Sequence, residues 1–189
     1  MIKELILKNR SYRRFYVNEP ISRATLEGLV DLARCTPSAA NRQPLKYLLS
    51  WTPERNERIF PHLAWAGYLA DWAGPAPDER PAGYIVILGD TRVSKNFSCD
   101  HGIAAQTMLL GAVEAGLGGC IIGSIKREDL RQALQIPAHF EILLVLALGR
   151  PQEQVVLDEV VGDGDIRYWR DAAGVHHVPK RRLADLIID

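Results

Sequence analysis

The sequence lacks the features that mark several specialised classes of protein. Lys and Arg together number 23, as do Asp and Glu, so no net charge would attract a nucleic acid or an anionic membrane surface. The longest apolar run, from Ile142 to Leu148, is far shorter than the ~20 residues that cross a bilayer. We therefore expect neither a nucleic-acid partner nor a membrane span.

Cysteine is scarce, and the three cysteines stand far apart at Cys35, Cys99 and Cys120. An odd number at such spacing gives neither a disulfide framework nor a paired-cysteine metal site. Residues 1–15 contain no apolar run of the kind that a secretory signal needs. The sequence therefore predicts a cytoplasmic protein with reduced, mostly buried cysteines.

Familiar catalytic and nucleotide-binding motifs are missing as well. The glycines of residues 116–124 (GLGGCIIGS) depart from the G-x-G-x-x-G spacing and precede an apolar strand, which indicates a helix end followed by a strand. Neither a serine nucleophile elbow nor a P-loop is present. Adjacent His176 and His177 would point to opposite faces of a strand, and Asp100 at a helix start is expected to cap that helix.

Blocks of helical and strand-like patterning alternate along the chain. Apolar periodicity predicts helices over residues 2–9, 22–35, 101–115 and 126–134, and two helical pieces within 54–72, broken near Pro61. β-rich runs predict strands at 46–51, 84–88, 120–122 and 140–148, and a tail hairpin formed by IRYWRD and VHHVP. The helix over 101–115 is apolar almost all round, which is typical of a central helix or a subunit interface. We predict one α+β domain over 1–189, with 150–189 as its tail.

Cationic clusters lie near both ends of the chain, at residues 10–14 (RSYRR) and 180–182 (KRR). Several cations beside a hydroxyl suit a phosphate, and each well-placed charge-assisted hydrogen bond contributes roughly 1.5–3 kcal/mol. The two clusters could join around one phosphate. Taken singly, each is better explained by a solvated basic patch.

Residues 37–44 (PSAANRQP) combine small side chains with two amides. Small side chains let a flat ligand approach the backbone, and amides both donate and accept hydrogen bonds. The alternative is an ordinary connection between a helix and a strand. Trp65, Tyr68 and Trp72 have helical spacing and would belong either to the core or to an aromatic lid.

Five segments, taken in order, resemble the motifs of the FMN-dependent nitroreductase family. They are RSYRRF, PSAANRQP, DHGIAAQTMLLGAVEAGLGGCIIGS, FEILLVLALGRP and VPKRRLADLI. The resemblance implies an α+β fold in which helices flank a central, mostly antiparallel sheet. It also implies an intertwined homodimer with FMN at each of two interface sites, and a tail that reaches toward the partner subunit.

The resemblance further assigns the contacts to the cofactor. Arg10, Ser11 and Arg13 would hold the phosphate and ribityl chain of FMN, and Lys180 and Arg182 would reach the same phosphate. The residues expected at the flavin ring are Pro37, Ser38, Ala39, Asn41, Gln43, Ile122 and Gly123. The first three would lie against the isoalloxazine, and the two amides would bond its polar edge or come from the partner subunit. The backbone of the last two would face the ring nitrogen that accepts hydride.

Three features depart from the family pattern. Asn9 replaces the first arginine of the usual pair, and Leu45 replaces the usual tryptophan after Gln43-Pro44. The chain is also short, so the lid over roughly residues 60–80 is expected to be small.

The resemblance implies ping-pong hydride transfer from NAD(P)H, through the flavin, to a nitroaromatic, quinone or similar small-molecule acceptor. Because the flavin carries the chemistry, no side chain is assigned a catalytic acid–base role. Reductive dehalogenation and oxygen-dependent flavin breakdown remain open as alternatives, as does a non-catalytic flavin- or nucleotide-binding regulator. No residue that would read the ribose phosphate of NADPH can be identified.

Overall fold

Four antiparallel strands, in the order β1-β2-β4-β3, form the central sheet. The computed structural model describes residues 1–188. The strands are β1 (Leu45–Ser50), β2 (Gly83–Asp90), β3 (Gly118–Ile122) and β4 (Phe140–Gly149). The inner pair, β2 and β4, shares the longest register, from Gly83 opposite Leu148 to Asp90 opposite Phe140. The expected α+β fold around an antiparallel sheet is confirmed.

Helices cover both faces of the sheet because its inner strands are apolar on both sides. The helices are α1 (Ile2–Lys8), α2 (Arg23–Arg34), α3 (Pro53–Glu57), α4 (Asp100–Glu114) and α5 (Arg127–Leu134), and the short 3₁₀ turns are η1 (Ala39–Asn41), η2 (Phe60–His62), η3 (Pro77–Glu79) and η4 (Leu183–Asp185). Along β2, Ile85 and Ile87 pack against α2 and α4, whereas Val86 packs toward α5 and η2. The alternation follows from the two-residue period of a strand.

Most of the predicted elements are confirmed to within one or two residues. Helix α2 begins after Ser22, whose Oγ accepts a hydrogen bond from Thr25 N at 3.0 Å, as expected of an N-cap. The second helical piece predicted within 54–72 is wrong, because the chain after η2 is irregular as far as Trp72. Leu63 forms a bridge with Ile125 instead, so its backbone pairs with the segment after β3 rather than with a helix turn.

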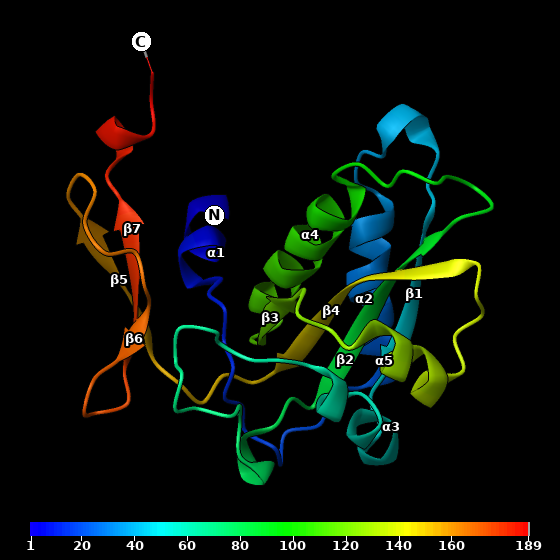
Figure 1. Ribbon diagram of the computed structural model, residues 1–189, viewed down its shortest axis with the longest axis horizontal. Coiled ribbons are helices and arrows are strands. Elements are labelled where there is room, and N and C mark those ends of the chain that lie inside the picture. Colours follow the sequence, from blue (N-terminus) through cyan, green and yellow to red (C-terminus); the bar gives the residue numbers. More distant parts are fainter. Residues whose placement is uncertain (189) are drawn as a thin grey trace.

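The tail forms a second, three-stranded sheet beside the body. Its strands β5 (Val155–Val160), β6 (Trp169–Arg170) and β7 (His176–Arg181) lie in the order β5-β7-β6. The predicted hairpin is confirmed by the antiparallel pairing of β6 with β7, whereas β5, which pairs parallel to β7, was not foreseen. In Figure 1 the helix α1 lies between this tail sheet and α4, and both chain ends lie on the same side of the molecule.

The cysteines differ from expectation in their burial. All three cysteines are free, but Cys35 and Cys99 are exposed and Cys120 alone of the three is buried, so the expectation of mostly buried cysteines is wrong. Cys35 ends α2 and Cys99 precedes α4, and both therefore stand in connections at the surface. Among residues 1–188, no helix combines the length and the apolar character that crossing a membrane requires.

Candidate functional site

The segment after α1 crosses the start of β3 at very close range. Ser11 forms a parallel bridge with Gly119, and Tyr12 N donates a hydrogen bond to Gly119 O at 3.0 Å. A Cβ placed on Gly118 would lie 2.5 Å from the Tyr12 ring, so no larger residue fits there without a shift of the chain. The glycine run therefore lets the N-terminal segment lie on the sheet, and the predicted helix end followed by a strand is confirmed.

A cavity of about 350 Å³ opens between this segment, α4 and β7. Its lining residues are Asn9, Arg10, Ser11, Arg13, Gln106, Leu109, Ile121, Tyr168, His176, Val178 and Lys180. We call it the cation cavity, because three of these side chains carry positive charge and none carries negative charge. Cations from near the two ends of the chain meet here.

Two residues that line the cation cavity each carry a buried nitrogen with no partner among residues 1–188. One is Arg10 Nε, although Nη2 of the same side chain donates to Ile6 O at 2.8 Å. The other belongs to His176, whose Nε2 lies 3.3 Å from Arg13 Nη1. A guanidinium cannot accept, so His176 Nε2 must accept and the unpartnered Nδ1 carries the proton. Unpaired buried donors beside cations suit an anion with several oxygens.

Electrostatics support this assignment of the His176 proton. Burial lowers the pKa of His176 to about 4, with further lowering by the charges of Arg13, Arg170 and His177. The imidazole is therefore neutral near pH 7 and free to accept from Arg13. With the ring neutral, His176 adds no fourth positive charge to the three cations of the cavity.

A second hollow, of about 200 Å³, adjoins the cation cavity at the end of β3. Its lining residues are Arg13, Ala64, Trp65, Ala66, Gly67, Cys120, Ile121, Ile122, Gly123, Ser124 and Tyr168. We call it the β3 hollow. Arg13, Ile121 and Tyr168 line both spaces, so the two adjoin, and together we call them the groove.

The PSAANRQP loop is held in a strained shape by a buried carboxylate. Ser38 Oγ donates to Asp100 Oδ2 at 2.6 Å and accepts from Gln43 N at 2.9 Å. Ala40, Asn41 and Gln43 have φ values of 51°, 52° and 50°, a region that is unfavourable for residues other than glycine. The expectation that Asp100 caps α4 is wrong, because Cys99 holds the N-cap position and no side chain caps the helix there. The Asp100 carboxylate instead accepts from Ser38 Oγ and from Ala39 N at 3.0 Å, and so anchors the loop.

One chain does not bring all the predicted site residues together. Arg10, Ser11, Arg13 and Lys180 line the cation cavity, and Ile122 and Gly123 line the β3 hollow. Pro37, Ser38 and Gln43 line a separate pocket of about 220 Å³, which shares no residue with either space. Ala39 and Asn41 belong to the same loop, in η1.

Arg182 also lies outside the described lining of the cation cavity. On β7, His176, Val178 and Lys180 line the cavity at a spacing of two residues. The strand ends at Arg181. Arg182 is the residue before η4, and its Nε pairs with Asp185 Oδ2 at 3.3 Å. The two-residue period therefore fails at Arg182, because the strand has already ended.

Several residues of the groove were missed in the sequence. Tyr168 lines both spaces. The Arg13 guanidinium lies 5.0 Å from its ring centroid, and Tyr68 N lies 3.3 Å from its hydroxyl. His176 was set aside because the adjacent histidines make no metal pair. The alternation of His176, Val178 and Lys180 was the signal that could have placed His176 beside the tail cation.

Comparison with known proteins agrees with this architecture. The chain is 28% identical over 158 residues to the putative NADH dehydrogenase/NAD(P)H nitroreductase of Methanothermobacter thermautotrophicus, covering 80% of this chain and 78% of that protein. It is 28% identical over 163 residues to the oxygen-insensitive NADPH nitroreductase of Salmonella typhimurium, covering 79% and 65%.

Among solved structures, a nitroreductase family protein from Clostridium novyi NT superimposes with a TM-score of 0.67 at 25% identity, covering 80% of this chain and 86% of that one. The NADPH:FMN oxidoreductase from Vibrio harveyi, solved in complex with NAD+, gives a TM-score of 0.63 at 24% identity, covering 80% and 69%. The sequence profile described as the nitroreductase family matches residues 6–150, which is most of the chain. The chain therefore belongs to the nitroreductase family.

Proposed function

We propose that the protein is an FMN-dependent oxidoreductase that takes electrons from NAD(P)H and passes them to a nitroaromatic, a quinone or a similar acceptor. The observation that carries the proposal is the meeting of Arg10, Arg13 and Lys180 beside the end of β3. Relatives support it by name, including the FMN reductase (NADPH) of Bacillus subtilis, which is 25% identical over 162 residues.

The groove fits FMN in its charge and in its division into two parts. A phosphate dianion suits the cation cavity, which has three cations, no carboxylate and two unpaired buried donors. The β3 hollow adjoins it and is lined by Ile122 and Gly123 at the end of β3 and by residues 64–67. Small residues there leave room for a flat ring.

Bound FMN would supply the acceptance and release of hydride, and the chain would hold and shield it. Arg10, Arg13 and Lys180 bind the phosphate, and Ser11 adds a hydroxyl beside them. Arg13 lines both spaces, so its charge also favours negative charge at the near edge of the ring. Trp65, which is 9% exposed, lines the β3 hollow and would keep water from the ring there.

A homodimer would complete the site. The loop over residues 37–43 lies outside the groove of its own chain, and the family resemblance assigns it to the flavin. A second subunit would bring this loop to the groove, with Asn41 and Gln43 at the ring edge. The free cysteines accord with a cytoplasmic location, which stays a prediction.

Absorbance spectroscopy of the purified protein tests the proposal. We expect a flavin spectrum, either on purification or after FMN is added and the excess removed, and bleaching by NADH or NADPH with recovery on addition of a quinone or nitroaromatic. A protein that takes up no flavin would contradict the proposal. One that holds FMN but oxidises neither nicotinamide with any acceptor would be a flavin-binding regulator instead.

A further inference from the structure

Glu153 lies where the tail meets the N-terminal segment, outside the described lining of both spaces. Its side chain is fully buried. The backbone on either side of it is bonded to Arg14 and to His176, at 2.9 Å in both cases. Glu153 therefore stands between the segment that carries Arg13 and the strand that carries Lys180.

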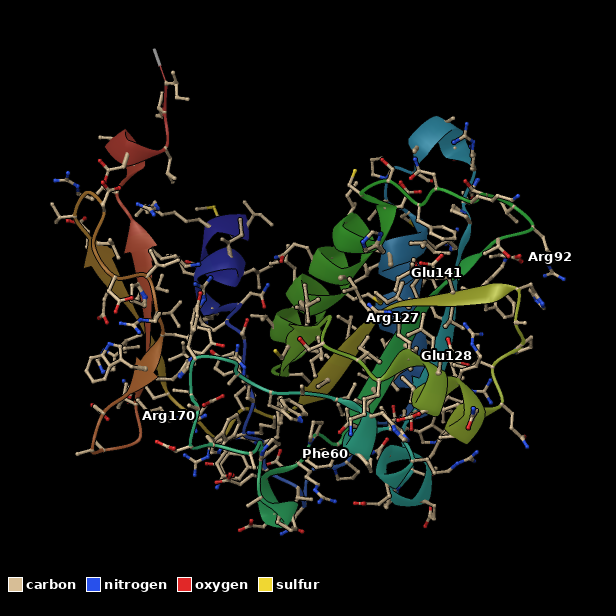
Figure 2. All side chains as sticks on the ribbon, viewed as in Figure 1. Phe60, Arg92, Arg127, Glu128, Glu141 and Arg170 are labelled. Carbon is tan, nitrogen blue, oxygen red and sulfur yellow. The ribbon has the colours of Figure 1, made fainter. Side chains whose placement is uncertain are left out.

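The carboxylate of Glu153 accepts three hydrogen bonds. Oε1 accepts from the consecutive backbone N–H groups of Arg13 and Arg14, the latter at 3.2 Å. Oε2 accepts from Arg170 Nη2 at 3.0 Å, and Arg170 lies over the Trp72 ring at 4.3 Å. Figure 2 labels Arg170 on the side of the tail sheet that faces the body. A buried carboxylate is strongly unfavourable unless it is paired, so these bonds fix the groups on both sides of it.

The bonds to two consecutive amides orient the backbone from which Arg13 leaves. The Arg13 N–H is turned to Glu153, while its guanidinium contacts Ser11 O at 3.2 Å and His176 Nε2 at 3.3 Å. These contacts place the charge at the junction of the cation cavity and the β3 hollow. Arg13 has no carboxylate partner among the described ion pairs, so its charge is left for a ligand.

We infer that Glu153 is a positioning residue, which aims Arg13 at the phosphate of FMN through the two backbone amides. The inference rests on the proposed FMN dependence. The positioning of Arg13 depends on the side-chain oxygen of residue 153 that accepts the hydrogen bonds of these amides. The Glu153–Arg170 ion pair, in contrast, stabilises the docking of the tail and leaves the aim of Arg13 unchanged.

Two double variants separate these roles. Glu153→Gln/Arg170→Met removes both charges but keeps a carbonyl oxygen for the amides of Arg13 and Arg14. Glu153→Met/Arg170→Met removes both charges and the oxygen at similar volume. Arg170→Met alone is the control for loss of the cation. If Glu153→Met/Arg170→Met does not fold by circular dichroism, Glu153→Asp replaces it, because aspartate withdraws the oxygens by one methylene.

The readout is the ratio of the Kd of riboflavin to the Kd of FMN, measured by fluorescence titration of flavin-free protein. Riboflavin lacks the phosphate, so the ratio isolates the phosphate contact from general loosening of the groove. We expect the ratio in Glu153→Gln/Arg170→Met to stay within about twofold of wild type. In Glu153→Met/Arg170→Met, or in Glu153→Asp, it should fall at least about tenfold.

An unchanged ratio in the variant without the oxygen would overturn the inference, as would an equal fall in both double variants. Wild-type protein that binds neither flavin would instead contradict the proposed function, so the two failures are distinguishable. A fall in the Kd ratio that occurs only in Glu153→Met/Arg170→Met, or in Glu153→Asp where that replaces it, supports the positioning role of Glu153.

Discussion

Lys180 and Arg181 are adjacent cations with different surroundings. Lys180 lines the cation cavity, whereas Arg181, on the other face of β7, donates to Gly162 O at 3.0 Å. The difference follows from the alternation of a strand, and it makes Arg181 a matched control for the charge of Lys180. Arg182, which pairs with Asp185, stays a predicted contact to the phosphate that one chain does not bring into place.

We expect Lys180→Ala to raise the Kd of FMN roughly 10- to 100-fold, the value of one charge-assisted contact. The Kd of riboflavin should change little, because the lost contact is to the phosphate. Arg181→Ala removes a cation from the same strand and should leave both constants near wild type. Equal effects of the two substitutions would place the phosphate elsewhere.

His176 makes stability depend on pH. Its pKa of about 4 in the folded protein lies below the ordinary 6.5, so between these values the unfolded chain binds more protons. The free energy of unfolding should therefore rise with pH through this window, by at most about 1.4 kcal/mol per pH unit from this group, and its contribution should level off above it.

Urea unfolding of wild type and His176→Asn between pH 4 and 8 measures this contribution as the difference between the two curves. Carboxylates that titrate in both proteins cancel in that difference. Curves that run parallel through the window would show that His176 does not titrate as its burial beside Arg13 requires.

At the scale of elements, the central sheet and its helices were predictable because their patterns are local. Residues 84–88 of strand β2 form a buried apolar run, and Ser22 caps α2 as its residue type indicates. The segment over 63–72 was not predictable from the sequence. Its aromatic residues have the spacing of a helix face, but each of their side chains packs against a different part of the protein. Trp65 packs in the core, the Tyr68 ring lies tilted against the Tyr168 ring with centroids 4.9 Å apart, and Trp72 lies under Arg170.

The site was predictable in part for the same reason. The cations of residues 10–13 and Lys180 carry a local signature, and they meet as expected. The contributions of Tyr168 and Glu153 depend on how the tail docks, which no local pattern encodes. Strand β5 was missed likewise, since it pairs parallel to β7 and such a pairing links segments distant in sequence.

Gly118 tests the contact between the N-terminal segment and β3. A methyl group there would lie 2.5 Å from the Tyr12 ring and 2.6 Å from Pro151 Cγ, so we expect Gly118→Ala to lower the free energy of unfolding by about 1–3 kcal/mol. Gly28, exposed on α2 with open space around it, is the control. Gly28→Ala should raise that free energy by about 0.5–1 kcal/mol, because alanine favours the helix.

Chemical denaturation of the two variants measures whether the free energy of unfolding falls in Gly118→Ala and rises in Gly28→Ala. A Gly118→Ala protein as stable as wild type would mean that the segment carrying Arg10 and Arg13 can move off the strand. The placement of those cations would then lose its structural basis.

At the scale of the molecule, the end of the tail carries apolar side chains that the rest of residues 1–188 leaves uncovered. Leu183, Leu186 and Ile187 are 72%, 63% and 58% exposed. Exposed apolar groups gathered in this way are typical of an interface, and the proposed homodimer would cover them. The loop over residues 37–43, which lies apart from the groove of its own chain, gives a second reason to expect a partner.

Replacing Leu186 and Ile187 together by aspartate should therefore raise the dissociation constant of the dimer, measured by analytical ultracentrifugation across a dilution series. Val93, 47% exposed in a loop of the body, provides the control Val93→Asp, which should leave that constant unchanged. A doubly substituted protein that stays as dimeric as wild type would remove the tail end from the interface.

A crystal structure of the protein grown with FMN tests the central claim most directly. The account predicts the phosphate of FMN in the cation cavity, within hydrogen-bonding distance of side chains from both the N-terminal segment and β7, Arg13 and Lys180 among them. A phosphate bound anywhere else, or held by one end of the chain alone, would contradict it.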